Sequence, residues 1–496
     1  MPWKVDSTGI SKTFYFVGAF FILACALLIS SGNHFILISS LCILVAVGYI
    51  LSISHLNYSF YLLAILLPFS QKIALPLSDI DLGFPSEAWL FILLIALFAV
   101  WMRKGFVSSE FLLHPVSLLL LVYLFFCGIS ALNSSLFWIS AKAISVKSVY
   151  ILVFYFGIYS VFKHTVNSIK LLFTAYSISL FLVSLYFLYN QSNYHWSKQT
   201  AAFAVNPFFS DHTIYSACLA FVLPFHVLQI FRIKKEQNAI QNLVIHGCIC
   251  AVFLTALYFT FCRAAWISCA IAILLGIGIK LKLKPRFYLA VISVAGLFAA
   301  LNAEKLTNNF YENKSISTAA TTSAIEQTQS ITNITTDVSN AERLNRWSCA
   351  WRMFKDKPML GFGPGTFQFQ YLGYQLEDEI TYISVFSPYN IPLGRGGSAH
   401  NEYLLLLTES GIFALAAFLI LIILLLKKSL HLLLRCPNTE QYNTCLYLLL
   451  GFVTYLIHGL FNNYLDTDKT AFLLFASMSL LVQHDLDFRS KLKVNE

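Results

Sequence analysis

Runs of about twenty apolar residues recur along most of this chain, and they confine it to one class of fold. A helix needs roughly 20 such residues to cross the hydrocarbon core of a bilayer, where every backbone polar group must find a partner inside the protein. Hydrophobic residues make up 58% of the 496 residues and charged residues 11%, whereas a soluble domain carries about 25% charged residues. We therefore predict an all-α polytopic membrane protein with about 12–14 transmembrane helices.

Fourteen apolar runs are candidate spans, and several of them are short. The candidates are Thr13–Ser31, His34–Ser52, Asn57–Ser70, Ala88–Met102, Pro115–Leu132, Val146–Phe162, Leu171–Tyr189, Thr213–Phe231, Leu243–Phe261, Ala264–Ile279, Phe287–Leu301, Tyr403–Leu426, Cys445–Tyr464 and Thr470–Gln483. Basic residues cluster after every second span from the fourth onward, which predicts cytoplasmic N- and C-termini by the positive-inside rule. The same clusters account for the net charge of +9 without a nucleic-acid partner, since no basic patch is interleaved with aromatic residues.

One long polar segment interrupts the apolar pattern and, on this topology, faces outward, which is the periplasm in a bacterium. The chain then divides into an N-terminal transmembrane region (1–301), a large periplasmic loop (302–402) and C-terminal transmembrane helices with a short cytoplasmic tail (403–496). Within the loop, residues 315–339 are rich in Ser, Thr, Ala and Asn and indicate a flexible insertion. Apolar residues at three- and four-residue spacing from 344 to 354 predict an amphipathic helix.

The chain carries no pattern typical of a metal or a nucleotide cofactor. The eleven cysteines show neither a paired framework nor metal-ligand spacing, and no HExxH or CxxC motif occurs. The glycine-rich segment Gly361–Gly365 lacks the Gly-Lys-Ser/Thr ending of a P-loop and follows no strand. We interpret it as a turn after Pro358 that sends the chain back toward His400, and we expect neither a metal nor a cofactor.

Three residues are the first candidates for chemistry. Arg263 lies between two apolar runs, where a cation is costly and is usually functional or paired. Its planar guanidinium could grip a pyrophosphate, or it could extend to the interface. Arg343 lies in the first turns of the amphipathic helix, where a basic residue on the solvated face is also expected. His400 precedes an apolar run, and the positive helix terminus there favours a neutral imidazole that can accept a proton, although a capping role is the alternative.

Five further polar residues form a second tier of candidates. Glu409, in Thr408-Glu-Ser-Gly411, follows His400 by nine residues, which places it about two and a half turns deeper. A carboxylate at that depth requires a partner, either an arginine or polar groups of the site. The other second-tier residues are Arg346, His212, Asp211 and Asn401.

An ordered set of motifs in the second half of the chain resembles the O-antigen ligase/O-antigen polymerase superfamily. The set consists of Arg343-Leu-x-x-Trp347, Ala350, Asp356-Lys-Pro358, Gly361-x-Gly363-x-Gly365-x-Phe367, His400-Asn401-x-Tyr403 and Glu409-x-Gly411. The segment Cys262-Arg263-Ala-Ala-Trp266 is similar to the family's Ser-Arg-Gly-Ala-Trp segment. The resemblance covers about residues 342–426, and the first half of the chain matches only as a polytopic membrane protein.

The resemblance implies a glycosyltransferase of the bacterial inner membrane. Such an enzyme takes a glycan from an undecaprenyl-pyrophosphate-linked donor and transfers it, at the periplasmic face, to lipid A-core or to another lipid-linked glycan. The family's roles, carried over by position, make His400 the general base and Arg263 and Arg343 the pyrophosphate ligands, without metal or nucleotide. Membrane lipids are the other expected partners. Ligase and polymerase activities, in lipopolysaccharide or other polysaccharide biosynthesis, both remain open.

A protein of another class, a flippase or exporter of lipid-linked glycans, is the alternative that the number of spans suggests. Transporters usually carry internal repeats and interrupted helices near the middle of the membrane. No clear repeat is visible in this sequence, and a hundred-residue outer loop fits a transporter poorly.

Overall fold

The computed structural model describes nine segments of the chain. They comprise residues 55–74, 81–163, 166–232, 239–284, 286, 338–376 with 379, 397–435 and 439–495. Within these segments, nine helices are long and apolar enough to cross a membrane. The prediction of an all-α polytopic membrane protein is therefore confirmed. The predicted spans 13–31, 34–52 and 287–301 and residues 315–337 of the predicted insertion lie outside the described residues.

The nine helices correspond to nine of the spans predicted from hydropathy. They are α4 (Ser86–Lys104), α6 (Pro115–Leu132), α7 (Phe137–Tyr150) continued by a π-helical turn (Ile151–Gly157) and α8 (Ile158–Phe162), α9 (Val166–Asn193), α11 (His212–Arg232), α12 (Ala239–Phe259), α13 (Arg263–Lys280), α20 (Glu402–Arg435) and α22 (Asp468–Asn495). Two more predicted spans are helical but fall outside that set: α3 (Leu56–Phe69), which is short, and α21 (Thr439–His458). The predicted amphipathic helix is α17 (Val338–Asp356).

The chain forms two compact units, each described here by itself. One comprises residues 1–106 and 160–180, and the other residues 107–159 and 181–496. In the first unit, α3 and α4 pack together, and the Trp89 indole N–H donates to the Ser59 carbonyl at 3.0 Å. A short antiparallel hairpin, β1 (Gln71–Ala74) with β2 (Asp81–Phe84), joins these two helices. The sequence did not predict this hairpin, because its strands are only four residues long.

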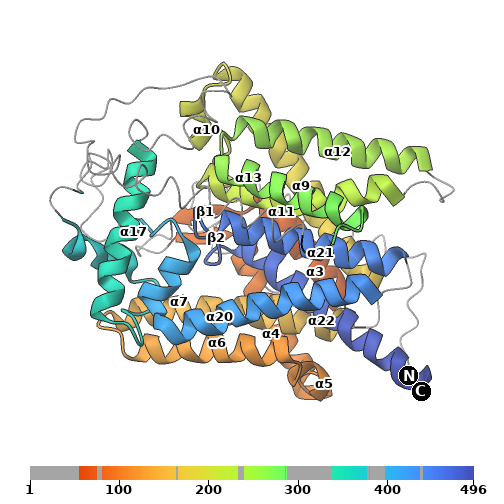
Figure 1. The fold of residues 1–496 in the computed structure, drawn as a ribbon, viewed down its shortest axis with the longest axis horizontal. Coiled ribbons are helices and arrows are strands. Elements are labelled where there is room, and N and C mark those ends of the chain that lie inside the picture. Colours follow the sequence, from red (N-terminus) through yellow and green to blue (C-terminus); the bar gives the residue numbers. More distant parts are fainter. Residues whose placement is uncertain are drawn as a thin grey trace, which may run out of the picture. The chain divides into compact units, whose positions relative to one another are not determined.

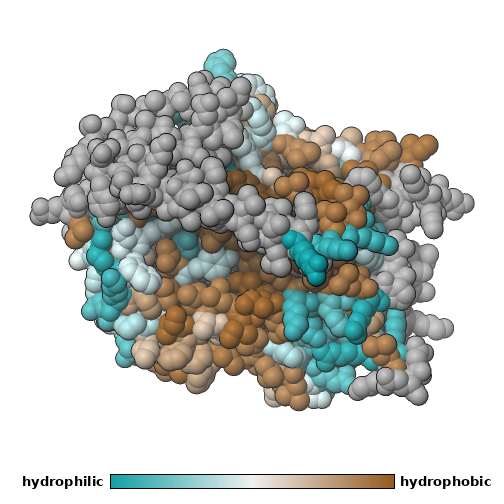
Figure 2. Space-filling view, viewed as in Figure 1, coloured by the Kyte–Doolittle hydropathy of each residue, from teal (hydrophilic) through white to brown (hydrophobic). Residues whose placement is uncertain are grey.

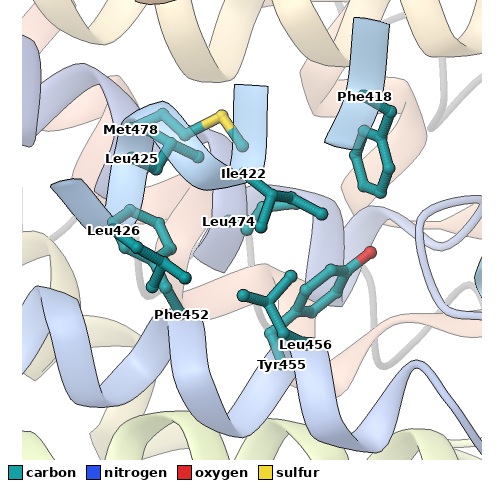
Figure 3. A pocket seen from close by; sticks show the side chains of 9 residues that line it. All are labelled: Phe418, Ile422, Leu425, Leu426, Phe452, Tyr455, Leu456, Leu474 and Met478. Carbon is teal, nitrogen blue, oxygen red and sulfur yellow. The ribbon is translucent and has the colours of Figure 1, made fainter. Parts of the chain in front are cut away.

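In the second unit, α20 packs against α6, α21 and α22, and a hydrophobic surface covers much of α20 and α6 (Figures 1 and 2). Hydrophilic residues gather over α17 and near the C-terminus (Figure 2). A small apolar cavity separates the three packed helices, with Ile422 from α20, Phe452 from α21 and Leu474 from α22 among its lining residues (Figure 3). This apolar packing holds α20, α21 and α22 side by side, so the residues at their ends lie near one another.

The helix α20 bends sharply at Gly411, whose backbone has φ +77° and ψ −177°. The rings of Tyr403 and Phe418 lie 6.4 Å apart, although a straight helix would separate these positions by about 22 Å. The predicted span from 403 to 426 is therefore helical but kinked, and the prediction that Glu409 lies about two and a half turns deeper than His400 is wrong. The spacing between His400 and Glu409 consequently does not translate into membrane depth.

The chain between Pro358 and Gly363 packs into this bend and pairs with the backbone that the bend exposes. Ile412 N–H donates to the Pro358 carbonyl at 3.0 Å. The N–H groups of Phe362 and Gly363 donate to the carbonyls of Thr408 and Glu409 at 3.0 and 2.8 Å. A Cβ atom at Gly411 would lie 2.0 Å from the Met359 carbonyl oxygen, so the close approach requires glycine.

Candidate active site

His400 lies two residues before α20 and is held in the left-handed backbone region, with φ +49°. Asn401 caps the helix, because its side-chain oxygen accepts from the N–H groups of Tyr403 and Leu404, each at 2.9 Å. The sequence placed His400 in the first turn of the span, and the structure places it just before the cap. Non-glycine residues rarely adopt this conformation, and those that do cluster at functional sites.

Hydrogen bonds join the short strip 398–403 to the connection between α21 and α22 (residues 459–467). We call this end of the helices the site end. The backbone N–H of Glu402 donates to the Gly459 carbonyl at 2.8 Å. The Glu402 carboxylate in turn accepts from the N–H groups of Tyr464 and Leu465 at 2.7 and 3.3 Å. Further bonds join Ser398 with Asn463, Asn401 with the Leu460 carbonyl and Tyr403 with the Leu456 carbonyl.

The imidazole of His400 is oriented by Asn462 of this connection. His400 Nδ1 lies 2.9 Å from Asn462 Oδ1, and an amide oxygen only accepts hydrogen bonds. The Nδ1 atom therefore carries the proton, and Nε2 is left with a free electron pair. This is the tautomer that a general base requires. Asn462 is not among the residues predicted from the sequence, where its only signal is the pair of asparagines that ends an apolar run.

Burial is the main cause that lowers the pKa of His400 from 6.5 to about 4. The positive charges of Arg346 and Arg343 lower this pKa further. The hydrogen bond that His400 donates to Asn462 and the negative charge of Asp211 raise this pKa, but their combined effect is smaller. The imidazole is therefore neutral at physiological pH, as the sequence analysis expected from the helix terminus.

Arg346 is an anchor of the strip that leads to His400. It is buried, and its Nε donates to the Glu342 carboxylate at 2.8 Å. Its Nη1 donates to the Ser398 carbonyl at 2.8 Å, and its guanidinium lies 5.0 Å from the centre of the Tyr371 ring. Because these groups occupy the guanidinium, Arg346 has little capacity left for a ligand.

Arg343 lies one helical turn before Arg346 on α17 and is half-buried. Among the described residues, no carboxylate forms an ion pair with Arg343. Its charge nevertheless acts on His400, Cys262 and His458. The structure thus brings Arg343 and His400, which the sequence singled out from separate segments, into one electrostatic environment.

Arg263 is the first residue of α13 and starts this helix at the site end. The preceding residue, Cys262, is buried, and its sulfur lies 3.5 Å from Nε2 of His458 at the end of α21. Burial raises the pKa of the Cys262 thiol, and the charge of Arg343 counteracts this rise. Arg263 therefore lies beside a residue that Arg343 influences, on an element separate from both Arg343 and His400.

Asp211 and His212 mark the start of α11 at the same end. The Asp211 carboxylate accepts from the N–H of Thr213 at 2.8 Å and lies 3.4 Å from Nδ1 of His212. Asp211 therefore caps the helix. Its negative charge raises the pKa of His400, whereas the positive charges of the arginines lower it. The two residues contribute to the field of the site, and no hydrogen bond joins either of them to His400 within the described residues.

Glu409 has a structural partner that the sequence did not indicate. Its two carboxylate oxygens accept from the backbone N–H groups of Gly365 and Phe367 at 2.8 and 3.0 Å. No arginine pairs with it in the described part of the chain. Glu409 and the glycine-rich segment thus lock the loop into the α20 bend. The predicted turn after Pro358 is present, and it packs against the bend at Gly411.

The described residues hold no group of three or more His, Cys, Asp or Glu side chains arranged for a metal ion. The polar groups at the site end include three arginines, the imidazole of His400, carboxylates that accept backbone N–H groups, and amide side chains. This set suits a reaction in which negative charge develops on a leaving group while a hydroxyl loses its proton.

The fold defines a polytopic membrane protein, and polar side chains from several of its helices gather at one end. Residues 248–419 match the model of the O-antigen ligase family. The match confirms the resemblance to the O-antigen ligase/polymerase superfamily and supports, at the level of that family, a membrane glycosyltransferase. It includes Arg263, Arg343, His400 and Glu409 and ends before Asn462. No curated protein matches the chain.

Proposed function

We propose that this protein transfers or polymerises a glycan from an undecaprenyl-pyrophosphate-linked donor onto a hydroxyl acceptor at the periplasmic face of the inner membrane. The observation that supports this most directly is the pairing of Nδ1 of His400 with Asn462 Oδ1 at 2.9 Å, which orients the imidazole at the site end. Lipid A-core and a second lipid-linked glycan are the two acceptor classes. The termini lie in the cytoplasm, as the positive-inside rule predicts.

His400 is the general base in this proposal. Its Nε2 takes the proton of the acceptor hydroxyl as the hydroxyl oxygen bonds to the anomeric carbon of the donor sugar. The bond between that carbon and the phosphate oxygen breaks, and the diphosphate on its lipid leaves with the electron pair. Positioning and proton removal of this kind contribute about 100- to 10,000-fold to a rate.

Arg343 and Arg263 carry the electrostatic part of the proposal. A guanidinium presents a planar set of N–H donors that matches phosphate oxygens. Charge stabilisation of a leaving group in a poorly hydrated site is commonly the largest single contribution to catalysis. The two arginines therefore bind the diphosphate before transfer and stabilise it as it departs.

The first test replaces the base. We expect His400→Ala to insert and fold normally but to form glycosidic bonds at least about 100-fold more slowly from purified donor and acceptor in detergent. The control is His431→Ala, because His431 is exposed on the part of α20 beyond the bend and away from the site end. Normal glycan formation by His400→Ala would rule out His400 as the base.

The same assay separates the transferase from the exporter alternative. An exporter moves lipid-linked glycan without making a bond, so purified wild-type protein in detergent would give no product. The surface-glycan gel of a deletion strain then separates the two transferase types. A single repeat on lipid A-core indicates a polymerase, and unattached long chains indicate a ligase.

A further inference from the structure

His400 and its partner Asn462 lie on two segments that a second hydrogen bond joins close by. Nδ1 of His400 lies 2.9 Å from Oδ1 of Asn462. Two residues further along each segment, the Glu402 carboxylate accepts from the backbone N–H of Tyr464 at 2.7 Å. The two hydrogen bonds close a small ring of chain, so a displacement of one bond displaces the other.

Glu402 holds both ends of the segment that carries Asn462. Before Asn462, the Gly459 carbonyl accepts from the backbone N–H of Glu402 at 2.8 Å. After Asn462, the N–H groups of Tyr464 and Leu465 donate to the Glu402 carboxylate at 2.7 and 3.3 Å. Because Glu402 is buried, water cannot replace its carboxylate without a cost, and the two N–H groups depend on it.

The side chain of Asn462 depends on this backbone for its position. Asn462 is buried, and its backbone N–H donates to the His458 carbonyl at 3.2 Å. Within the described part of the chain, its side-chain nitrogen Nδ2 has no hydrogen-bond partner. The segment 459–465 therefore holds the amide against the imidazole of His400.

We propose that Glu402 is a positioning residue for the base: it holds the segment that carries Asn462, and Asn462 in turn keeps His400 in the tautomer with the proton on Nδ1. This inference rests on the proposed function of the site and adds a residue to it. The role requires an oxygen acceptor at the reach of a glutamate side chain. It does not require a negative charge.

Two substitutions of Glu402 separate reach from charge. Glu402→Gln keeps the acceptor oxygen at the same reach and removes the charge. Glu402→Asp keeps the charge but draws the carboxylate back by roughly 1.5 Å, the length of a C–C bond, which is enough to break its hydrogen bonds. We expect glycan formation by the purified Gln variant to stay near the wild-type rate. That of the Asp variant should fall by about 100-fold, the typical cost of a misplaced catalytic group.

A second readout follows the tautomer of His400 without substrates or turnover. Nitrogen NMR spectroscopy of full-length protein labelled at histidine distinguishes a protonated ring nitrogen from a bare one, and the His400 signals are those lost in His400→Ala. In the wild type and in Glu402→Gln at neutral pH, we expect Nδ1 to be protonated and Nε2 to be bare. In Glu402→Asp, part of the population should carry the proton on Nε2, because the tautomer is set by the partner of Nδ1.

Glu409→Asp is the matched comparison. Glu409 lies on the same helix, and its carboxylate also accepts from two backbone N–H groups, those of Gly365 and Phe367 at 2.8 and 3.0 Å. Neither belongs to the segment that carries Asn462. We expect Glu409→Asp to lower thermal stability in detergent, as Glu402→Asp does, but to leave the tautomer of His400 unchanged. An equal change of tautomer in both variants would mean that general loosening is the cause, and this would overturn the proposal.

The Glu402 variants give the other decisive outcomes. A wild-type tautomer in folded Glu402→Asp overturns the proposal, and so does a tautomer in Glu402→Gln that is changed as much as in Glu402→Asp. If Glu402→Asp does not fold, Glu402→Gln still decides, because loss of the Nδ1–H tautomer there contradicts a role that needs no charge. A purified wild-type protein that forms no glycosidic bond, while the tautomers respond as expected, would remove the transferase function and leave the positioning role in place.

Discussion

Two arginines one helical turn apart on α17 have different surroundings, although the sequence gives them similar context. Arg346 is buried against Glu342, Ser398 and Tyr371, so its cost of desolvation is offset by fixed partners. Arg343 has no ion pair among the described residues and remains available. Spacing on an amphipathic helix predicts that both are solvated, and only the tertiary contacts show that Arg346 is buried and paired.

At the same scale, Asn462 is a position where two substitutions have different consequences. Asn462→Ala releases the His400 ring, and we expect transfer to slow by about 100-fold, the typical cost of a misplaced catalytic group. Asn462→Asp keeps a hydrogen-bond acceptor and adds a negative charge, which raises the pKa of His400. Because a base acts only when neutral, activity is lost as pH falls through this pKa, and the raised pKa moves that loss to higher pH.

The measurement is the pH dependence of kcat/KM for the donor, which reports the ionisation of the free enzyme. The acid limb of wild-type protein should lie near pH 4, in keeping with the pKa of about 4, and that of Asn462→Asp at least about one unit higher. Coincident acid limbs would show that Asn462 does not control the proton affinity of the base.

At the scale of elements, the bend in α20 and the loop packed into it depend on each other. The bend leaves backbone carbonyls of Thr408 and Glu409 without helical partners, and the loop supplies N–H groups to both. The sequence shows only a glycine in an apolar run at 411, which is compatible with a straight helix. The bend could not be predicted, because its partners lie about fifty residues earlier in the chain and act through backbone atoms.

Gly411→Ala tests this dependence. A Cβ at this position meets the Met359 carbonyl at 2.0 Å on a backbone of positive φ, so we expect a loss of several kcal/mol of stability or a misfolded protein. Gly128→Ala is the matched control, since Gly128 is helical and has open space around its Cβ. There we expect no loss, or a gain of about 0.5–1 kcal/mol. Thermal unfolding in detergent compares the two, and equal stability would mean that the bend is not required.

At the scale of the whole molecule, polar groups gather at both ends of the second unit and serve different purposes. The site end carries His400 and its neighbours. The opposite end carries Asp485, whose Oδ2 lies 2.9 Å from His114 Nε2, 3.0 Å from Lys428 Nζ and 2.7 Å from Arg489 Nη2. These contacts join α6, α20 and α22, so the helices are fixed at one end by ionic contacts and at the other by the strip 398–403.

We expect Asp485→Asn to destabilise the protein by about 3–5 kcal/mol, because it leaves buried His114 and the largely buried Lys428 without their shared anion. Glu110→Gln, a change of equal charge at an exposed position, should have little effect. Thermal unfolding in detergent measures both. Two variants with the same midpoint would show that the ionic contacts do not hold the helices together.

Hydropathy and charge were sufficient for the fold class and for nine spans, because a bilayer imposes length and apolarity on each helix separately. The motifs brought forward His400 and Arg343, which the structure places in one electrostatic environment. The sequence did not predict the role of Asn462, the hydrogen bonds of Glu402 to Tyr464 and Leu465, or the backbone partners of Glu409. Each of these depends on contacts between segments distant in the chain, which local pattern does not encode.

The turn after α17 is secured to α20 at Thr408 and Glu409, only eight and nine residues beyond His400. Backbone hydrogen bonds thus join the loop that follows the Arg343 helix to the helix that follows His400. These hydrogen bonds involve neither the Arg343 nor the His400 side chain. Either side chain can therefore be replaced without removing the backbone contacts between the loop and α20.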